Sequence, residues 1–279
     1  MRMGARAARL AAAGPHALAP VLPPFCTRSG SVFSNLFSNL LASADPIGST
    51  AAGGQSLLDQ AHVILGTPIG AALQAGEAEA LFGCGCFWGA EKGFWRLPGV
   101  VTTAVGYAGG TAPNPSYEQV CSGRTGHAEV VRVVWRQDRI DFSDLLKLFW
   151  ECHDPTQGNR QGNDRGSQYR SAIFVDDPAL LELAKASGQA YGAQLAGAGY
   201  GAISTEIARQ PSFFYAEAYH QQYLAKLGSR PYCSAEPSGV LLGDFPGSHY
   251  LLPAQLWRAY DWSISHCVLR GENSPILLP

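Results

Sequence analysis

Residues 83–89 place two cysteines and three glycines at the joint between a strand and a helix, and this joint constrains the fold more than any other stretch. The apolar run before it, 80–82, is typical of the end of a strand, and residues 90–97 favour a helix. Amides at a helix N-terminus favour negative charge, so a thiol there can have its pKa lowered from about 8.5 to roughly 3.5–7.5. We therefore expect Cys86 to be a thiolate nucleophile. The alternative is a small cysteine buried behind a strand.

The composition is that of one globular domain with extensions. The chain has 279 residues, of which 46% are hydrophobic and 15% charged, and its net charge is -2. So small a charge gives no reason to expect nucleic acid or an anionic membrane as a partner. No apolar run reaches the roughly 18 residues of a membrane span. We expect no membrane association and a monomeric protein.

The cysteines fit neither a disulfide framework nor a zinc site. Seven cysteines lie at positions 26, 84, 86, 121, 152, 233 and 267. Their number is odd and their spacing irregular, which argues against the disulfide framework of a secreted protein. They do not form two CxxC pairs, so we expect no structural zinc.

The N-terminus differs from the rest of the chain. Residues 1–44 carry four arginines, several serines and prolines, and no acidic residue before Asp45. This composition is typical of an organellar transit peptide, so we expect a chloroplast or mitochondrial location. The alternative is an extension without an address, which would leave the chain in the cytoplasm.

Hydrophobic periodicity and turn residues divide the rest of the chain into strands, helices and loops. Strands are predicted at residues 78–83, 100–107, 127–135, 169–175 and 202–208, with a strand-like piece at 62–68. Helices are predicted at residues 87–97, 143–152 with Ser143 as N-cap, 178–195 and 213–227. Polar residues, Gly and Pro predict long loops at 111–125 and 153–168.

The order of these elements predicts the fold class. From residue 78 to residue 175 it is strand, helix, strand, strand, helix, strand, which is the split β-α-β (ferredoxin-like) arrangement. We expect an α+β fold, a two-layer sandwich with a mixed sheet. The predicted divisions are a transit peptide at 1–44, a linker at 45–77, a catalytic domain at 78–245 and an extension of unknown role at 246–279. The extension, which holds Cys267, is expected to be a short helix or poorly ordered.

One acidic residue lies on an apolar strand face. In the strand at 127–135, the alternation of side chains puts Glu129 on the same face as Val131, Val133 and Trp135. Burial against a core disfavours the charged form and raises the pKa of a carboxyl, so Glu129 is a candidate general acid. The alternative is a solvated glutamate at the end of the strand.

Aromatic and polar residues supply the rest of a candidate site. Phe87 and Trp88 follow Cys86 directly and can form the wall of an apolar pocket for a small alkyl or thioether group, or simply pack in the core. The loops add Tyr117, Tyr169 and Asp164. A phenol can donate a hydrogen bond to a polarised oxygen, whereas Asp164 is equally consistent with a solvated loop acid.

Other residues leave further chemistry open. His127 or His153 could serve as a general base for a cysteine hydrolase, although no hydrolase signature surrounds Cys86. Cys233 follows the last predicted helix in a coil, where it is suited to reach another sulfur. Cys84 is less suited to pair with Cys86, because residues two apart rarely meet disulfide geometry.

The signature Gly85-Cys86-Phe87-Trp88-Gly89 resembles that of the A-type peptide methionine sulfoxide reductases, which reduce the S epimer of methionine sulfoxide. Further blocks similar to that family are Gly106 to Gly110, Pro113 to Tyr117, Gly126 to Glu129, His153 to Thr156, Gln161 to Asp164, Gln168 to Ser171 and Ala218 to Leu224. The resemblance runs from about His62 to about Cys233, and the blocks occur in family order.

The resemblance implies a role for each candidate site residue. Cys86 would attack the sulfoxide sulfur, Phe87 and Trp88 would hold the S-methyl group, and Glu129 would protonate the sulfoxide oxygen. Cys86 would become a sulfenic acid, and Cys233 would then condense with it to form a disulfide. Tyr117 and Tyr169 would hydrogen-bond the oxygen, with Asp164 in the same polar cluster.

The resemblance also implies the partners: oxidised proteins and free methionine sulfoxide as substrates, thioredoxin as external reductant, and neither a metal nor an organic cofactor. The activity would repair oxidative damage. Cys84 departs from the family pattern, and no second recycling cysteine stands at 240–242. Two rival functions are a general thiol-disulfide oxidoreductase acting through Cys84 and Cys86, and a module that binds oxidised methionine without turnover.

Overall fold

The structure is a computed structural model of the chain that describes residues 56–230, 232–258 and 272–277. The predicted transit peptide at 1–44 and Cys267 lie outside these residues, so both predictions stand untested. Within the described ranges, no helix is long and apolar enough to cross a membrane.

Six strands form one sheet in the order β7-β6-β1-β3-β2-β8. The strands are β1 (Glu77–Cys84), β2 (Val100–Ala108), β3 (Ala128–Arg136), β6 (Ser171–Phe174), β7 (Glu206–Ala208) and β8 (Phe214–Tyr215), and a separate hairpin pairs β4 (Arg160–Gln161) with β5 (Asp164–Arg165). Only β6 and β7 pair in parallel in the large sheet, and all other neighbours are antiparallel. The predicted α+β class with a mixed sheet is confirmed.

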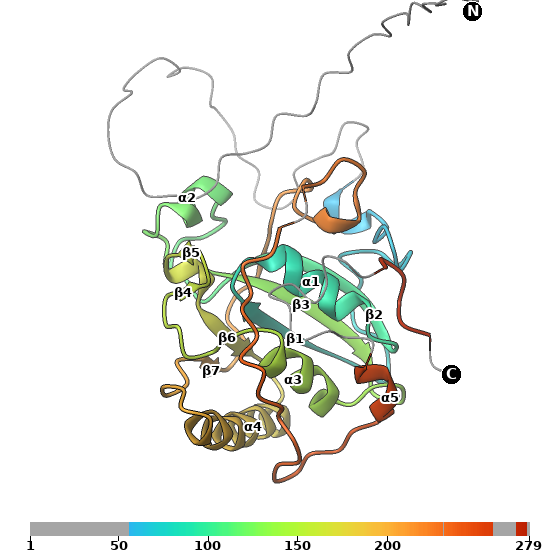
Figure 1. The fold of residues 1–279 in the computed structure, drawn as a ribbon. Helices are drawn as coiled ribbons and strands as arrows, with labels where there is room; N and C mark the ends of the chain where they lie inside the picture. The colour runs from blue at the N-terminus through green and yellow to red at the C-terminus, as the bar shows by residue number, and fades with distance from the viewer. Residues whose placement is uncertain (1–55, 231, 259–271, 278–279) are drawn as a thin grey trace, which may run out of the picture.

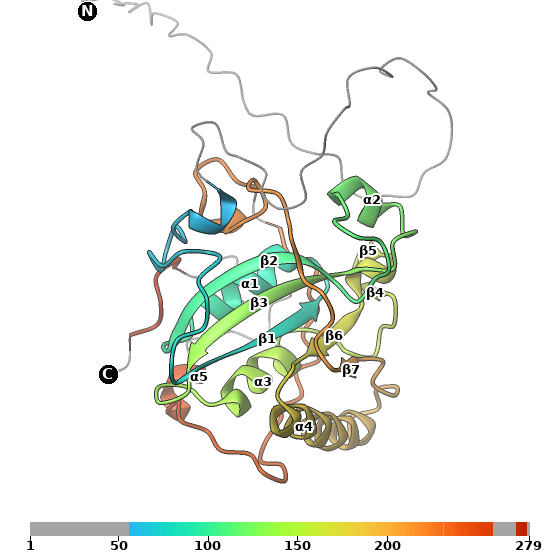
Figure 2. The same ribbon diagram turned by 180° about the vertical axis from the view of Figure 1, so that it is seen from behind.

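The helices lie mainly on one side of this sheet. They are α1 (Phe87–Trp95), α2 (Tyr117–Cys121), α3 (Phe142–Glu151), α4 (Pro178–Gly197) and α5 (Ala254–Trp257), with short 3-10 helices η1 (Leu57–Asp59), η2 (Ser167–Tyr169) and η3 (Tyr223–Ala225). Figure 1 shows α1 and α3 in front of the sheet and α4 beside the edge formed by β6 and β7. In Figure 2 the strands lie in front of α1 and α3, so these two helices share one face.

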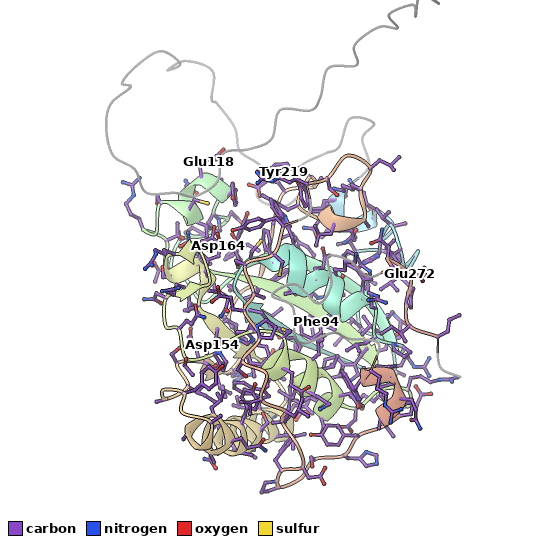
Figure 3. All side chains as sticks on the ribbon, viewed as in Figure 1. Phe94, Glu118, Asp154, Asp164, Tyr219 and Glu272 are labelled. Atoms are coloured by element: carbon purple, nitrogen blue, oxygen red, sulfur yellow. The ribbon has the colours of Figure 1, made fainter. Side chains whose placement is uncertain are left out.

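The main core fills the space between the sheet and these helices. The Phe82 ring of β1 stacks on the Phe94 ring of α1 with a centroid distance of 4.7 Å. Phe94, labelled in Figure 3, is fully buried. Val131, Val133 and Trp135 of β3 belong to the same cluster, as their alternation predicts. A smaller apolar cluster around Leu81, Val130 and Phe174 covers the opposite face, so Glu129 is on the helix side.

Helix α3 begins one residue earlier than predicted, and its cap is Asp141 in place of Ser143. The Asp141 carboxylate accepts a hydrogen bond from the Ser143 amide at 2.8 Å. Asp144 returns the contact by accepting from the Asp141 amide, which completes a capping box. The Ser143 hydroxyl instead accepts a bond from the His249 amide at 3.0 Å. Asp141 wins because a carboxylate at this position also interacts favourably with the helix dipole.

The helix predicted at 213–227 does not form. Residues 214–215 instead pair with the edge of β2 as β8, and the chain then turns. The Gln221 side chain binds both the amide and the carbonyl of Val105 at 2.9 Å, in place of a further strand residue. Gln222 adopts a left-handed backbone with φ 46°. Pairing the exposed edge of β2 therefore outweighed the helical pattern of this segment.

The predicted loops contain short regular pieces. The loop at 111–125 includes α2, which starts with a capping box between Ser116 and Gln119. The loop at 153–168 holds the β4–β5 hairpin and η2. The strand-like piece at 62–68 is a turn closed by a single bridge between Ala61 and Pro68. Each piece is too short to show a hydrophobic period, which is why the sequence did not reveal it.

The described parts of the predicted linker and C-terminal extension pack against the core. Leu57 and Ile69, which precede β1, are buried. Leu252, just before α5, and Leu256, within α5, are also buried. Figure 1 shows the C-terminal segment, in orange and red, running past α1 and α3 on the helix side. The domain limits remain predictions; the described part of the extension contains α5.

A buried carboxyl on α3 holds this C-terminal segment. Asp144 has no exposed surface and accepts hydrogen bonds from the amides of Leu251 at 2.9 Å and Leu252 at 3.3 Å. Because these amides are buried or half-buried, loss of the carboxylate would leave them without their acceptor.

We expect Asp144→Ala to lower the free energy of unfolding by about 2–3 kcal/mol, since hydrogen bonds to a charged group are lost and amides are left unpaired. The matched control is Asp138→Ala, which removes an exposed ion pair with Arg136 and should cost at most about 0.5 kcal/mol. Urea denaturation of both variants measures the difference. Equal stability of the two variants would show that Asp144 does not anchor the segment.

Candidate active site

Cys86 is the N-cap residue of α1, at the end of the loop that leaves β1. Gly85 before it has φ 87°, and a Cβ there would lie 2.6 Å from the Gln161 side chain. Both the backbone conformation and the close approach require glycine at this position. The side chain of Cys86 is 7% exposed, so the thiol is buried at the start of a helix.

The prediction that the helix start lowers the pKa of Cys86 is wrong. Burial raises the pKa of this thiol well above its ordinary value, and the charges of Glu129 and Asp164 raise it further. A hydrogen bond from the Trp88 amide lowers it, but by less than these opposing effects. Loss of water and two nearby carboxyls therefore outweigh the helix N-terminus. The thiol is protonated in the resting site at neutral pH.

Glu129 lies beside the start of α1. Its side chain is 2% exposed, and its Oε2 accepts a hydrogen bond from the Phe87 amide at 3.1 Å. Burial, opposed by the Phe87 bond and reinforced by the Asp164 charge, raises the pKa of Glu129 to about 8. The carboxyl is thus mostly protonated at neutral pH, as expected for a group that faces the core. In the folded chain Glu129 therefore lies next to Cys86.

Polar side chains from three loops surround these two groups. The Tyr232 hydroxyl donates to Asp164 Oδ1 at 2.6 Å, and Asp164 Oδ2 is buried with no hydrogen-bond partner among the described residues. Burial raises the pKa of Tyr117 and of Tyr169, and the Glu129 charge raises both further, so both phenols stay protonated. The structure therefore places the predicted tyrosines and Asp164 near Glu129. Figure 3 shows Asp164 and Tyr219 at the end of the molecule where α1 begins.

An aromatic group covers the start of α1. The Trp88 ring stacks on Tyr223 with a centroid distance of 3.9 Å, and its Nε1 donates to His220 Nδ1 at 3.2 Å. The His220 ring also contacts Phe87 and Tyr117 at centroid distances of 5.2 and 4.6 Å. Phe87 is buried whereas Trp88 is half-buried, so Trp88 borders the accessible side of the site.

A second buried glutamate fixes the segment that carries His220 and Tyr223. Glu91 of α1 accepts bonds from the Gln222 amide at 2.9 Å and from its side-chain amide at 2.8 Å. Thr103 of β2 donates to the same carboxyl at 3.1 Å. Burial raises the pKa of Glu91 to about 7 despite these bonds. This contact holds the segment against α1, and with it the aromatic cover.

Cys233 lies against the first turn of α1. It is 8% exposed, and a Cβ added to Gly89 would lie within van der Waals overlap of the Cys233 sulfur. Gly89 is three residues after Cys86 and on the same side of the helix. The negative charge of Cys233 also raises the pKa of Cys86. The predicted resolving cysteine is therefore near the predicted nucleophile.

The two histidines considered as bases have other surroundings. His153 binds the Phe149 carbonyl through Nδ1 at 2.7 Å and the Ser171 hydroxyl through Nε2 at 2.8 Å. His127 is buried against Phe214, and neither ring nitrogen has a hydrogen-bond partner among the described residues. Burial lowers the pKa of both rings. Neither arrangement provides a base aimed at Cys86.

The geometry can be compared with known proteins. A family model described as peptide methionine sulfoxide reductase matches residues 78–241. The peptide methionine sulfoxide reductase MsrA of Azotobacter vinelandii is 58% identical over 182 residues, which cover 65% of this chain and 84% of that protein. The chain belongs to the peptide methionine sulfoxide reductase family. The predicted resemblance to its A-type members and the predicted enzyme class are confirmed.

Solved structures agree with this family. Methionine sulfoxide reductase A of Corynebacterium diphtheriae is 43% identical with a TM-score of 0.60, and the match covers 72% of this chain and 95% of that one. Mxr1 from Saccharomyces cerevisiae in reduced form is 34% identical with a TM-score of 0.53, covering 59% and 92%. The Azotobacter and Corynebacterium relatives are bacterial, so they give no support to the predicted organellar location.

Three residues of this site were not predicted from the sequence. His220, Tyr223 and Tyr232 contact Trp88 or Asp164, yet none was assigned a role. The available signal was the dense group of Tyr, His and Gln at 219–223, which is unusual for a solvated helix. The sequence predicts a helix at 213–227, and a helix would point these side chains in different directions. The contact of this group with α1 was therefore not expected.

Glu129→Gln should flatten the pH dependence of stability. A carboxyl whose pKa rises from 4.5 to about 8 on folding adds stability that is fully present below about pH 4.5 and is lost as the pH rises through about 8. The amide does not titrate and still accepts the Phe87 bond. Between about pH 5 and 9 the unfolding free energy of the wild type should fall. The fall in the variant should be smaller by at least about 1.4 kcal/mol.

Urea titrations at several pH values measure this difference. Glu118→Gln, at an exposed position of α2, is the matched control and should parallel the wild type. A Glu129→Gln curve parallel to wild type would mean that Glu129 is not protonated in the folded state.

Proposed function

We propose that this family member reduces the S epimer of methionine sulfoxide, free or in proteins, to methionine. The observation that carries the proposal is the position of Glu129 beside Cys86. This buried carboxyl has a pKa of about 8 and accepts a hydrogen bond from the amide of Phe87, the residue that follows Cys86. A sulfoxide needs a nucleophile at sulfur and a proton at oxygen, and Cys86 and Glu129 can supply these from one end of α1.

The aromatic group supports a small apolar subsite. Phe87, Trp88 and Tyr223 belong to one aromatic group around His220 at the start of the helix that Cys86 caps, and such a group suits the methyl group and the polarisable sulfur of the substrate. His220 accepts a hydrogen bond from Trp88 Nε1 and so holds the indole ring in place. With the methyl group there, the sulfoxide sulfur would lie next to the thiol.

The opposite side of the site suits the sulfoxide oxygen. Tyr117 and Tyr169 remain protonated and can donate hydrogen bonds to it, while Glu129 supplies the proton. Asp164 would orient Tyr232 and, by its charge, keep the proton on Glu129. Donors aimed at an oxygen on which negative charge develops stabilise that charge most in a site with little water.

Neutralisation of Glu129 also affects the nucleophile. The Glu129 charge is one of the causes that raise the pKa of Cys86. A protonated Glu129 no longer repels a thiolate, so Cys86 ionises more readily while the acid is ready to donate. In the overall step the oxygen moves from the substrate sulfur to Cys86, which becomes a sulfenic acid, and methionine leaves.

Cys233 would then resolve the sulfenic acid. Its sulfur attacks Cys86 Sγ, water leaves, and a Cys86–Cys233 disulfide forms. The position of Cys233 against Gly89 supports this assignment. A dithiol protein of the thioredoxin type would reduce the disulfide by exchange, so that no metal or organic cofactor is required.

Further proposals concern the rest of the chain. The strands β1 and β2 both run antiparallel to β3 between them, which supports the split β-α-β description. We propose a catalytic domain at 78–245, in agreement with the matched range 78–241, and a monomeric state. The composition of residues 1–44 supports an organellar address for the chain.

A stereospecific assay tests the proposed function. With dithiothreitol as reductant, the full chain should reduce the S epimer of a methionine sulfoxide peptide and leave the R epimer unchanged. Cys86→Ser should reduce neither, because a hydroxyl at this position is a far weaker nucleophile. Chromatography of the peptide products measures both epimers. Reduction of disulfides alone would favour the thiol-disulfide oxidoreductase, and binding without product would favour the binding module.

Glu129→Gln should lower kcat/KM for the S epimer by about 100-fold or more at neutral pH, because the amide donates a hydrogen bond but not a proton. In wild type, kcat/KM should fall as the pH rises through about 8, where Glu129 loses its proton, and the variant should lack this fall. Glu182→Gln, exposed on α4, is the control and should keep the wild-type profile. An unchanged rate for Glu129→Gln would remove this residue from the acid role.

A further inference from the structure

Three cysteines line one cavity behind the active site. The cavity has a volume of about 10 Å³ and lies between α1, the end of α3 and the coil after residue 232. Cys84, Cys152 and Cys233 contribute to its wall, and the remaining lining residues are Gly89, Ala90, Gly93, Leu148 and Ala235. The small residues on α1 provide the space, and the sulfurs are the reactive groups in it.

Two of these thiols contact each other. Cys84 is the last residue of β1 and Cys152 follows the end of α3, and their sulfurs lie within 4.8 Å of one another. Both thiols are buried and in the reduced form. The fold thus brings together residues 68 positions apart, whereas Cys84 and Cys86 are neighbours in sequence.

His153 completes a group of three that resembles the ligands of a soft metal, because one of its ring nitrogens is also within 4.8 Å of both sulfurs. Its ring, however, is already bound at both nitrogens, to the Phe149 carbonyl and to the Ser171 hydroxyl. Burial also lowers its pKa to about 4, so it stays neutral and keeps these bonds. Without His153 only two protein ligands remain, which is fewer than a zinc site uses. The pair is better suited to redox chemistry.

Cys233 connects this pair with the nucleophile. Its sulfur lies against Gly89 in the first turn of α1, on the same helix face as Cys86, and it also borders the cavity that contains Cys84 and Cys152. Burial, together with the charge of Cys152, raises the pKa of Cys233 to about 12. Cys233 therefore contacts the first turn of the helix that Cys86 caps and also borders the cavity with Cys84 and Cys152.

We propose that Cys84 and Cys152 form an internal dithiol that reduces the Cys86–Cys233 disulfide through the shared cavity. This inference rests on the proposed function, because that function generates the disulfide. It assigns a task to Cys84, which departs from the family pattern and which the mechanism above does not use.

The exchange balances without a further reagent. The Cys152 thiolate attacks the Cys233 sulfur, the bond between Cys86 and Cys233 breaks, and Cys86 leaves as a thiolate. The Cys84 thiolate then attacks Cys152, and Cys233 leaves from the mixed disulfide. Two protons pass from Cys84 and Cys152 to Cys86 and Cys233. In sum, one disulfide is reduced and a Cys84–Cys152 disulfide forms.

The consequence is a second turnover before any external reductant is needed. Without the internal pair, a reduced chain makes about one methionine and stops at the Cys86–Cys233 disulfide. With the pair, Cys86 and Cys233 are regenerated once, so a reduced chain makes about two. External dithiol is then required to reduce both disulfides.

The experiment counts methionine released per chain. The full-length protein is reduced with dithiothreitol, freed of reductant by gel filtration and mixed with an excess of S-epimer substrate. We expect about two methionines per wild-type chain and about one for Cys84→Ala, Cys152→Ala and Cys233→Ser. Peptide mapping of the spent wild type should identify a Cys84–Cys152 disulfide. Each alanine variant keeps the cysteines at 26, 121 and 267, so a difference cannot come from them.

The control is Ala90→Ser, which alters the same cavity without removing a thiol and should still yield about two methionines. Equal yields from wild type, Cys84→Ala and Cys152→Ala would overturn the internal dithiol. One zinc ion per purified chain, lost in either alanine variant, would also overturn it in favour of a metal site. If wild type releases no methionine, the proposed function itself fails. Circular dichroism of each variant establishes that it is folded.

Discussion

The hydrogen bond from the Phe87 amide to Glu129 joins helix α1 to the sheet at the point where the chemistry is proposed to occur. It sets the carboxyl beside the residue that follows Cys86. Because both groups are withdrawn from water, the pKa of each is raised, and the Glu129 charge raises that of Cys86 further. Both groups therefore keep their protons at neutral pH, which suits a substrate that must accept a proton as it is attacked.

The small residues of α1 have a related function. Gly89 and Gly93 leave room on the helix face behind Cys86, and sulfur atoms occupy that room. The same helix uses Glu91 to hold Gln222, and so the aromatic cover over its first turn. One short helix thus positions the nucleophile, its apolar surroundings and the contact with Cys233.

Much of the fold was predictable because its signals are local. The alternation in β3 predicted that Glu129 faces the core with Val131, and the glycines predicted the turn that precedes α1. The segment at 213–227 was mispredicted because its conformation depends on the unpaired edge of β2, a partner more than a hundred residues away. The pKa of Cys86 was mispredicted for a similar reason, since the helix start is local, whereas the burial and the two carboxyls that oppose it are not.

By itself, the sequence determined the family, the α+β class and the identity of the reactive groups, because these depend on residue type and on order along the chain. Only the tertiary structure decided which groups meet. It placed Tyr232 against Asp164 and Cys84 against Cys152, contacts that span 68 residues each. It also decided the protonation of Cys86 and Glu129, since the burial and neighbouring charge that set a pKa exist only once distant segments have packed together.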